Sequence, residues 1–219
     1  MVSMEELQKS IKALTQIPTA SLSDALDQLG LRGYMSHEIR PILPNVKIVG
    51  PAVTIKHRIV NKRMPFTPAL KAIDEARAGD VLVISSDDDL RDVALLGGLM
   101  GLASKVKGLS GAVLGGGVRD IRELRELGFQ VFSLSVVPTT SLGRTEIEGV
   151  NVPLRCGGLT VNPGDLIVGD DDGVVVIPKD RVWEVIERAR KFDEVERMEA
   201  EELKKGTSLV ETVAKFARI

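Results

Sequence analysis

Hydrophobic positions along the chain follow two different periods, and the clearest alternation between them lies in the middle of the sequence. Short, uniformly apolar segments predict strands at DVLVIS (80–85), GAVLGG (111–116) and FQVFSLS (129–135). Segments of helical period lie between them, within 93–109 and over 120–128. Strands that are apolar on both faces and separated by helices are typical of a parallel sheet covered on both sides. The pattern therefore predicts a central βαβαβ unit.

The segments before this unit alternate less regularly. Helical patterns are expected over residues 4–14, in SLSDALDQLG up to Gly30, and over 67–79 with Gly79 at the end. The segment VKIVGPAVTIKHRIV (46–60) is rich in β-branched residues, which predicts a strand broken near Gly50-Pro51.

The pattern changes again after Pro138. Residues 159–178 contain two or three apolar segments joined by tight turns, without room for crossover helices, so this half is predicted to be antiparallel. From Lys179 a long helix is expected, with one apolar stripe formed by Val182, Val185, Ile186, Ala189 and Phe192. Acidic residues replace the stripe beyond Phe192. We therefore expect one α/β domain over 1–178 and a C-terminal helical arm over 179–219 that lies in solvent or contacts a neighbouring subunit.

Composition removes several classes of function. The net charge is -2 and aromatic residues are only 3% of the 219 residues, which argues against nucleic-acid binding. The single cysteine, Cys156, allows neither a disulfide framework nor a cysteine metal site within one chain. No apolar segment approaches the ~20 residues of a membrane span, and the charged first helix is unlike a secretory signal. A cytoplasmic protein without a membrane partner is the expectation.

The segment LGGGVRDIREL (114–124) places three glycines directly before an adjacent cation and anion, Arg119 and Asp120. In one interpretation, Asp120 is only the N-cap of the next helix and Glu123 completes a capping box. In the other, the pair lies at the carboxyl end of a parallel strand, where open α/β sheets bind ligands. There the Asp120 carboxylate can hold a hard cation such as Mg²⁺, and the Arg119 guanidinium can bind a substrate oxyanion.

Two further glycines, Gly97 and Gly98, open a helix in LLGGLM (95–100). Unpaired N–H groups at a helix N-terminus attract anions, so a small carboxylate fits here; close packing of helix on strand is the alternative. Because the strand after this helix leads to Arg119 and Asp120, both loops should open on one edge of the sheet.

Other motifs carry less chemistry. The glycines match neither GxGxxG nor GxxxxGK[ST], which argues against a nucleotide-binding loop. The segment GDDDGVV (169–175) is better explained as a polar hairpin turn than as a calcium loop, because no acidic ligand follows at the EF-hand spacing.

Taken in order, these motifs resemble the regulator of ribonuclease activity A family, which includes class II 4-hydroxy-4-methyl-2-oxoglutarate aldolases and oxaloacetate decarboxylases. The resemblance rests on SDAL (23–26), VGPAVT (49–54), AGDVLVI (78–84), GLMGLASK (98–105), GGGVRD (115–120), QVFSLS (130–135) and PGDLIVGDDDGVVVIP (163–178). It implies a swivelling β/β/α domain assembled as a trimer or a dimer of trimers, with active sites between subunits.

The resemblance also implies roles for individual residues. Asp120 would be the ligand of Mg²⁺ or Mn²⁺, Arg119 the substrate-binding arginine, and the backbone at Gly97, Gly98, Leu99 and Met100 the cradle of a pyruvate carboxylate. A glutamate from the next subunit would be Glu196, with Glu199 as the fallback.

The expected function is a metal-dependent carbon–carbon lyase that releases pyruvate from a small 2-oxo acid; the alternative is a non-enzymatic, protein-binding regulator of ribonuclease activity. One departure affects this expectation. The family's aldolase signature has an aspartate where this chain has Gly98, and its loss should hurt aldol cleavage more than decarboxylation.

Overall fold

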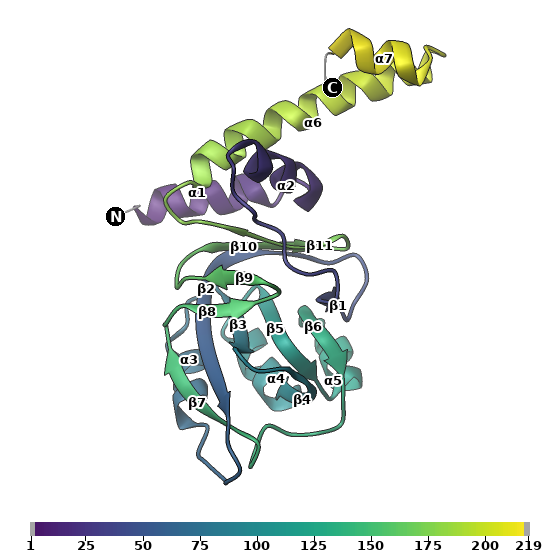
Figure 1. Ribbon diagram of the computed structural model, residues 1–219. Helices are drawn as coiled ribbons and strands as arrows, with labels where there is room; N and C mark the ends of the chain where they lie inside the picture. Colours follow the sequence, from purple (N-terminus) through teal and green to yellow (C-terminus); the bar gives the residue numbers. More distant parts are fainter. Residues whose placement is uncertain (1–2, 217–219) are drawn as a thin grey trace.

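A mixed β-sheet organises the fold in the computed structural model, which describes residues 3–216 (Figure 1). Along this stretch the hydrogen-bonded strand order is β1-β6-β5-β3-β2-β10-β11, with β4 beside β5 and β7 beside β2. The strands are β1 Arg40–Pro41, β2 Lys47–Ile59, β3 Val81–Ser86, β4 Leu90–Leu96, β5 Gly111–Val118, β6 Val131–Val136, β7 Thr145–Val150, β8 Leu154–Cys156, β9 Leu159–Val161, β10 Leu166–Asp170 and β11 Gly173–Ile177. The helices are α1 Met4–Leu14, α2 Thr19–Gln28, α3 Thr67–Glu75, α4 Gly98–Val106, α5 Ile121–Leu127, α6 Val182–Lys204 and α7 Leu209–Phe216.

The predicted βαβαβ unit is confirmed and explains the apolar strands. β3, β5 and β6 pair in parallel, and α4 and α5 connect them. Along β3, Leu82 and Ile84 pack into the core under α3, α4 and α5, whereas Val81 and Val83 pack into a second core on the other face. Because both faces are covered, every residue of the strand is apolar or small.

One strand, β4, lies outside the prediction, which expects a helix within 93–109 and assigns no strand directly before Gly97. β4 pairs in parallel with the end of β5, Leu96 opposite Val118, and α4 begins two residues later. A short apolar run of this kind cannot be distinguished from a buried helical turn by its period. β4 places the start of α4 beside the end of β5, as the candidate site requires.

The break predicted near Gly50-Pro51 is wrong, because β2 runs through both residues as one strand. Its pairing partner changes there instead. Residues up to Pro51 pair antiparallel with β10, and residues from Ala52 onward pair in parallel with β3. Gly50 is required at this junction because a Cβ would overlap the carbonyl oxygen of Gly79.

The antiparallel half is confirmed by the β10–β11 hairpin. Asp170 pairs with Gly173, which leaves a two-residue turn in the segment GDDDGVV, as the hairpin interpretation predicts. The Asp170 carboxylate accepts hydrogen bonds from the Thr19 amide at 2.9 Å and the Thr19 hydroxyl at 2.5 Å, which ties the turn to α2. Helix α3 ends at Glu75, before the predicted Gly79, because Ala76 is already extended.

The C-terminal helices extend away from the sheet, as Figure 1 shows. The first half of α6 packs on α2 and buries the predicted stripe at Val182, Val185, Ile186 and Ala189. Its second half projects beyond the body, and α7 folds back on it. The division at residue 178 stays a prediction, and residues 217–219 of the predicted arm lie outside the described residues. Among residues 3–216, no helix is long and apolar enough to cross a membrane.

Candidate active site

Two strand-to-helix loops meet at one edge of the sheet, as the sequence predicts. β4 leads through Gly97 into α4, and β5 leads through Arg119 and Asp120 into α5. The Arg119 amide donates to the Leu96 carbonyl oxygen at 3.1 Å, which joins the two loops. The residues predicted from both loops are therefore neighbours in space.

Asp120 adopts a conformation that is uncommon for a residue other than glycine. Its φ is 58° and its ψ is 40°, in the left-handed region. The capping-box interpretation is wrong: Asp120 stands at the N-cap position of α5, but its side chain makes no capping hydrogen bond there. Oδ2 instead accepts from the Gly98 amide of α4 at 2.9 Å. The left-handed backbone turns the carboxylate away from its own helix and toward the neighbouring one.

Arg119 lies beside this carboxylate, and both side chains remain partly exposed. Its Nε is 3.5 Å from Asp120 Oδ2, and the side chains are 42% and 38% exposed, respectively. Gly97 gives them room, because a Cβ on it would lie 2.6 Å from Asp120 Oδ2 and 3.0 Å from Arg119 Nε. The arrangement keeps one cation and one anion next to each other at the surface.

The N-terminus of α4 supplies donors, although fewer than the sequence predicts. The Gly98 amide is taken by Asp120. Within the described part of the chain, the amides of Leu99 and Met100 donate no hydrogen bond. These two N–H groups and the helix dipole favour an anion at this end.

Glu123 lies in the site although the sequence predicts no role for it there. Its carboxylate lies over the first turn of α4, where Oε2 occupies the space of a Cβ on Gly98. In the sequence, Glu123 follows Asp120 by one helical turn, and this spacing fits a capping box as well as it fits a second acid in the site. The left-handed backbone at Asp120, which turns the Asp120 side chain away from α5, decides against the capping box.

The three glycines before Arg119 are explained by the chain itself. Gly115, Gly116 and Gly117 are buried, and a Cβ on them would overlap Ser85, Leu95 and Val137, respectively. Neighbouring segments pack against this part of β5, so no ligand is needed to account for the glycines.

Glu196 is not brought to this site within one chain. It is exposed on α6, and Figure 1 shows α6 on the opposite side of β10 and β11 from α4 and α5. The fallback residue, Glu199, is buried, with 8% of its surface exposed. A contribution from either residue to a neighbouring copy stays a prediction.

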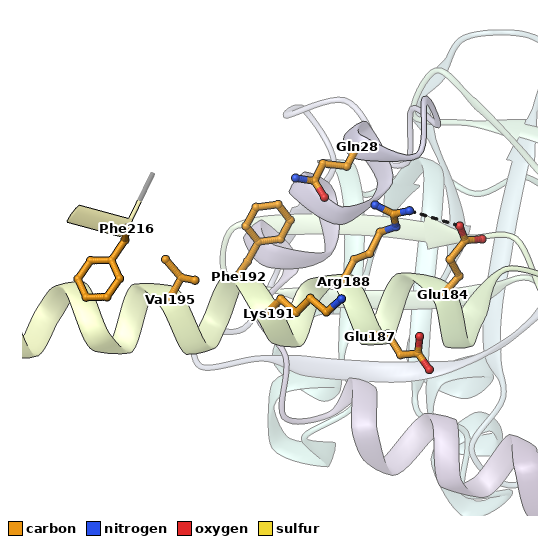
Figure 2. Close-up of a pocket in the computed structure, with 8 residues that line it drawn as sticks. All are labelled: Gln28, Glu184, Glu187, Arg188, Lys191, Phe192, Val195 and Phe216. Carbon is orange, nitrogen blue, oxygen red and sulfur yellow. Dashed lines mark ion pairs between the residues drawn. The ribbon is translucent and has the colours of Figure 1, made fainter. Parts of the chain in front are cut away.

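A cleft along α6 lies away from the two strand-to-helix loops that carry Gly97, Arg119 and Asp120. It is lined by Gln28, Glu184, Glu187, Arg188, Lys191, Phe192, Val195 and Phe216, as shown in Figure 2. Arg188 and Glu184 face each other across one turn of α6 at 3.8 Å. Its lining includes this one ion pair and none of the strand-end residues, so we do not assign the chemistry to it.

The donor set fits a divalent ion held by few protein ligands. No group of three or more His, Cys, Asp or Glu side chains suited to a metal occurs within residues 3–216. Mg²⁺ is nevertheless commonly bound by one or two carboxylates, with substrate and water completing the shell. Asp120 fits this role because its Oδ1 makes no hydrogen bond to the described residues, while Oδ2 is fixed by the Gly98 amide.

Comparison with known proteins identifies the family. The model of the RraA-like family, described as Aldolase/RraA, matches residues 19–176. A Halalkalibacterium halodurans protein with the provisional name 4-hydroxy-4-methyl-2-oxoglutarate aldolase is 40% identical over 187 residues, which cover 84% of this chain and 85% of the relative.

Solved structures agree with this match. A Pseudomonas syringae protein of unassigned function superposes with a TM-score of 0.84 at 33% identity, covering 94% of this chain and 96% of that one. Streptomyces coelicolor RraAS2, titled an unusual member of the RNase ES inhibitor RraA family, gives a TM-score of 0.77 at 29% identity, covering 87% of this chain and 96% of that one. The expected fold is thus confirmed, and the chain belongs to the RraA-like family.

Proposed function

We propose that this chain is a divalent-metal-dependent carbon–carbon lyase that releases pyruvate from a small 2-oxo acid, by cleavage of 4-hydroxy-4-methyl-2-oxoglutarate, by decarboxylation of oxaloacetate, or both. The observation that carries the proposal is the Asp120 carboxylate. It is held out of its own helix by a left-handed backbone, fixed by the Gly98 amide, and paired with Arg119. A residue that only caps a helix has no need of this geometry.

Both reactions pass through the enolate of pyruvate. In aldol cleavage, the substrate hydroxyl loses its proton to a base and its oxygen becomes a carbonyl oxygen. The C3–C4 bond breaks, and its electron pair forms the enolate, which then takes a proton at C3. In decarboxylation, the bond to the C4 carboxylate breaks, carbon dioxide leaves, and the same enolate takes a proton. Stabilising negative charge on the enolate oxygen is therefore the shared requirement.

The residues of the site meet this requirement in separate ways. The Leu99 and Met100 amides bind the substrate carboxylate at the positive end of α4. The Arg119 guanidinium places a fixed positive charge beside the developing enolate, and loss of such a stabiliser costs about 3–4 kcal/mol of barrier. Asp120 would hold the ion, Mg²⁺ or Mn²⁺, which when bound acts as a Lewis acid on the keto oxygen.

The site would be completed by a second copy of this chain. Glu196 belongs to α6, which Figure 1 shows on the opposite side of β10 and β11 from α4 and α5, projecting from the body. A trimer or a dimer of trimers would bring Glu196 from one copy to Asp120 of the next. We further propose that the reaction takes place in the cytoplasm, where small 2-oxo acids occur.

A coupled assay tests the proposal. Purified protein with Mg²⁺ and oxaloacetate or 4-hydroxy-4-methyl-2-oxoglutarate is followed by lactate dehydrogenase and NADH, which report pyruvate. We expect metal-dependent pyruvate release that Asp120→Ala abolishes. Asp171→Ala, in the exposed β10–β11 turn, is the matched control and should behave like the parent. Full activity in Asp120→Ala would show that the site assignment is wrong.

A non-enzymatic, protein-binding regulator of ribonuclease activity is the second candidate. The similarity to RraAS2 favours it, and so does an exposed apolar stripe on α4, where Leu99, Leu102 and Val106 are 82%, 43% and 78% exposed. This candidate gains support if the protein binds a ribonuclease in a pull-down and calorimetry detects no affinity for Mg²⁺ or Mn²⁺.

A further inference from the structure

Two acidic side chains converge on Gly98 from the loop and helix that follow β5. Asp120 accepts a hydrogen bond from the Gly98 amide, and its Cβ lies 3.4 Å from the place of a Cβ on Gly98. The Glu123 carboxylate overlaps that same place, with its Cδ at 3.0 Å and its Oε2 closer still. Gly98 thus leaves open the space that Glu123 fills. A carboxylate from α5 stands where a side chain from α4 would otherwise project.

Neither helix capping nor ion pairing explains the position of the Glu123 carboxylate. Glu123 does not complete a capping box, because the Asp120 side chain makes no cap. Its neighbours on the same helix, Arg122 and Glu126, pair with each other at 3.0 Å. Within residues 3–216, by contrast, the exposed Glu123 side chain has no hydrogen bond or ion pair. It lies instead over the first turn of α4, in the space of a Cβ on Gly98, at the positive end of that helix.

The two proposed reactions differ in whether the substrate hydroxyl must lose a proton, and Glu123 could accept that proton. Aldol cleavage must remove a proton from the substrate hydroxyl, whereas decarboxylation removes none. Asp120 is a poor base for this step because Oδ2 is held by the Gly98 amide and lies beside the Arg119 guanidinium, and Oδ1 is the oxygen proposed to hold the ion. Glu123 offers carboxylate oxygens without such partners in the described chain, one helical turn away.

We propose that Glu123 is the proton acceptor for aldol cleavage, acting directly or through one water, and so determines which 2-oxo acids this site can cleave. The inference rests on the proposed function. The hydroxyl proton passes to Glu123 as the C3–C4 bond breaks, and it can return to C3 of the enolate, so that the residue ends in its starting state. Substrates that lose carbon dioxide do not need this residue as a base.

The test compares the two reactions in one preparation. Glu123→Gln should lower the ratio of aldol-cleavage kcat to oxaloacetate-decarboxylation kcat by about 10²-fold, since a positioned base commonly contributes 10²–10⁴-fold. Glu126→Gln, on the same helix and at the same surface hollow, is the matched control and should leave the ratio within about twofold of the parent.

A second measurement separates a proton acceptor from a ligand. Calorimetric titration with Mn²⁺ and oxalate, which mimics the enolate, should give a Kd for Glu123→Gln within about threefold of the parent, while Asp120→Asn should lose binding. The double variant Gly98→Asp/Glu123→Ala returns a carboxylate to the same space from α4 and should recover part of the ratio that Glu123→Ala loses.

The outcomes are distinct. A parent that releases no pyruvate from either substrate and binds no oxalate overturns the proposed function and this inference with it. A parent with both activities whose ratio is unchanged in Glu123→Gln overturns the inference alone. The inference alone is also overturned if Glu123→Gln loses both activities equally, or if the parent decarboxylates oxaloacetate but performs no aldol cleavage.

Discussion

The left-handed backbone at Asp120 can be separated experimentally from its carboxylate by two substitutions. Asp120→Ala and Asp120→Gly both remove the carboxylate and its hydrogen bond to the Gly98 amide. They differ in the energy of the left-handed backbone conformation at residue 120. Alanine at φ 58° is destabilised by about 1–2 kcal/mol in the left-handed conformation, whereas glycine adopts it without a penalty.

The free energy of unfolding should therefore differ between the two variants. Glycine loses about 0.4–1 kcal/mol through the greater freedom of its unfolded chain, which offsets part of the alanine penalty. The remaining difference is about 1 kcal/mol in favour of Asp120→Gly. Neither variant should release pyruvate or bind Mn²⁺ with oxalate, because both lack the carboxylate. The glycine variant is thus expected to be the more stable of two inactive proteins.

Urea unfolding followed by far-ultraviolet circular dichroism measures this difference, and the coupled assay measures activity on the same samples. Asp120→Ala with a midpoint at or above that of Asp120→Gly would refute the argument that the structure holds residue 120 in a strained conformation. Pyruvate release by Asp120→Gly at the parent's rate would refute the role of the carboxylate.

Three other predictions concern Arg119, the buried His57 and Gly115. Arg119→Ala should lower kcat for pyruvate release by about 10²–10³-fold, and equal kcat values in variant and parent would remove Arg119 from the reaction. Burial lowers the pKa of His57 from 6.5 to about 4. Between pH 6.5 and pH 4 the unfolded chain therefore binds more protons than the folded one, and the free energy of unfolding should fall as the pH drops through this range. His57→Gln should flatten the dependence of the urea midpoint on pH there, and an unchanged slope would contradict the role of His57. Gly115→Ala should destabilise the fold by about 1–3 kcal/mol because its Cβ overlaps Ser85; Ser85→Gly should recover part of the loss in a double-mutant cycle, and simple additivity would argue against this contact.

The sequence predicts the central sheet well because burial on both faces leaves a simple signal, as in Val81–Ile84. It also predicts that the loops at Gly97 and Arg119 meet, since parallel strands end at one edge. It fails where conformation depends on distant partners. β4 is recognisable only beside β5, and the direction of the Asp120 side chain depends on a single backbone angle. Glu123 is missed for the same reason, because its position fits a cap until that angle is known.

The change of partners along β2 has a consequence for how the chain acquires its structure. The first half of this strand pairs with β10, and Lys47 and Asp170 are separated by 123 residues. During synthesis, that edge emerges from the ribosome long before its complement exists. Contacts of such long range form slowly and leave unpaired, apolar edges exposed in the interval. We therefore expect newly made chains to depend on chaperones until the C-terminal hairpin has been translated.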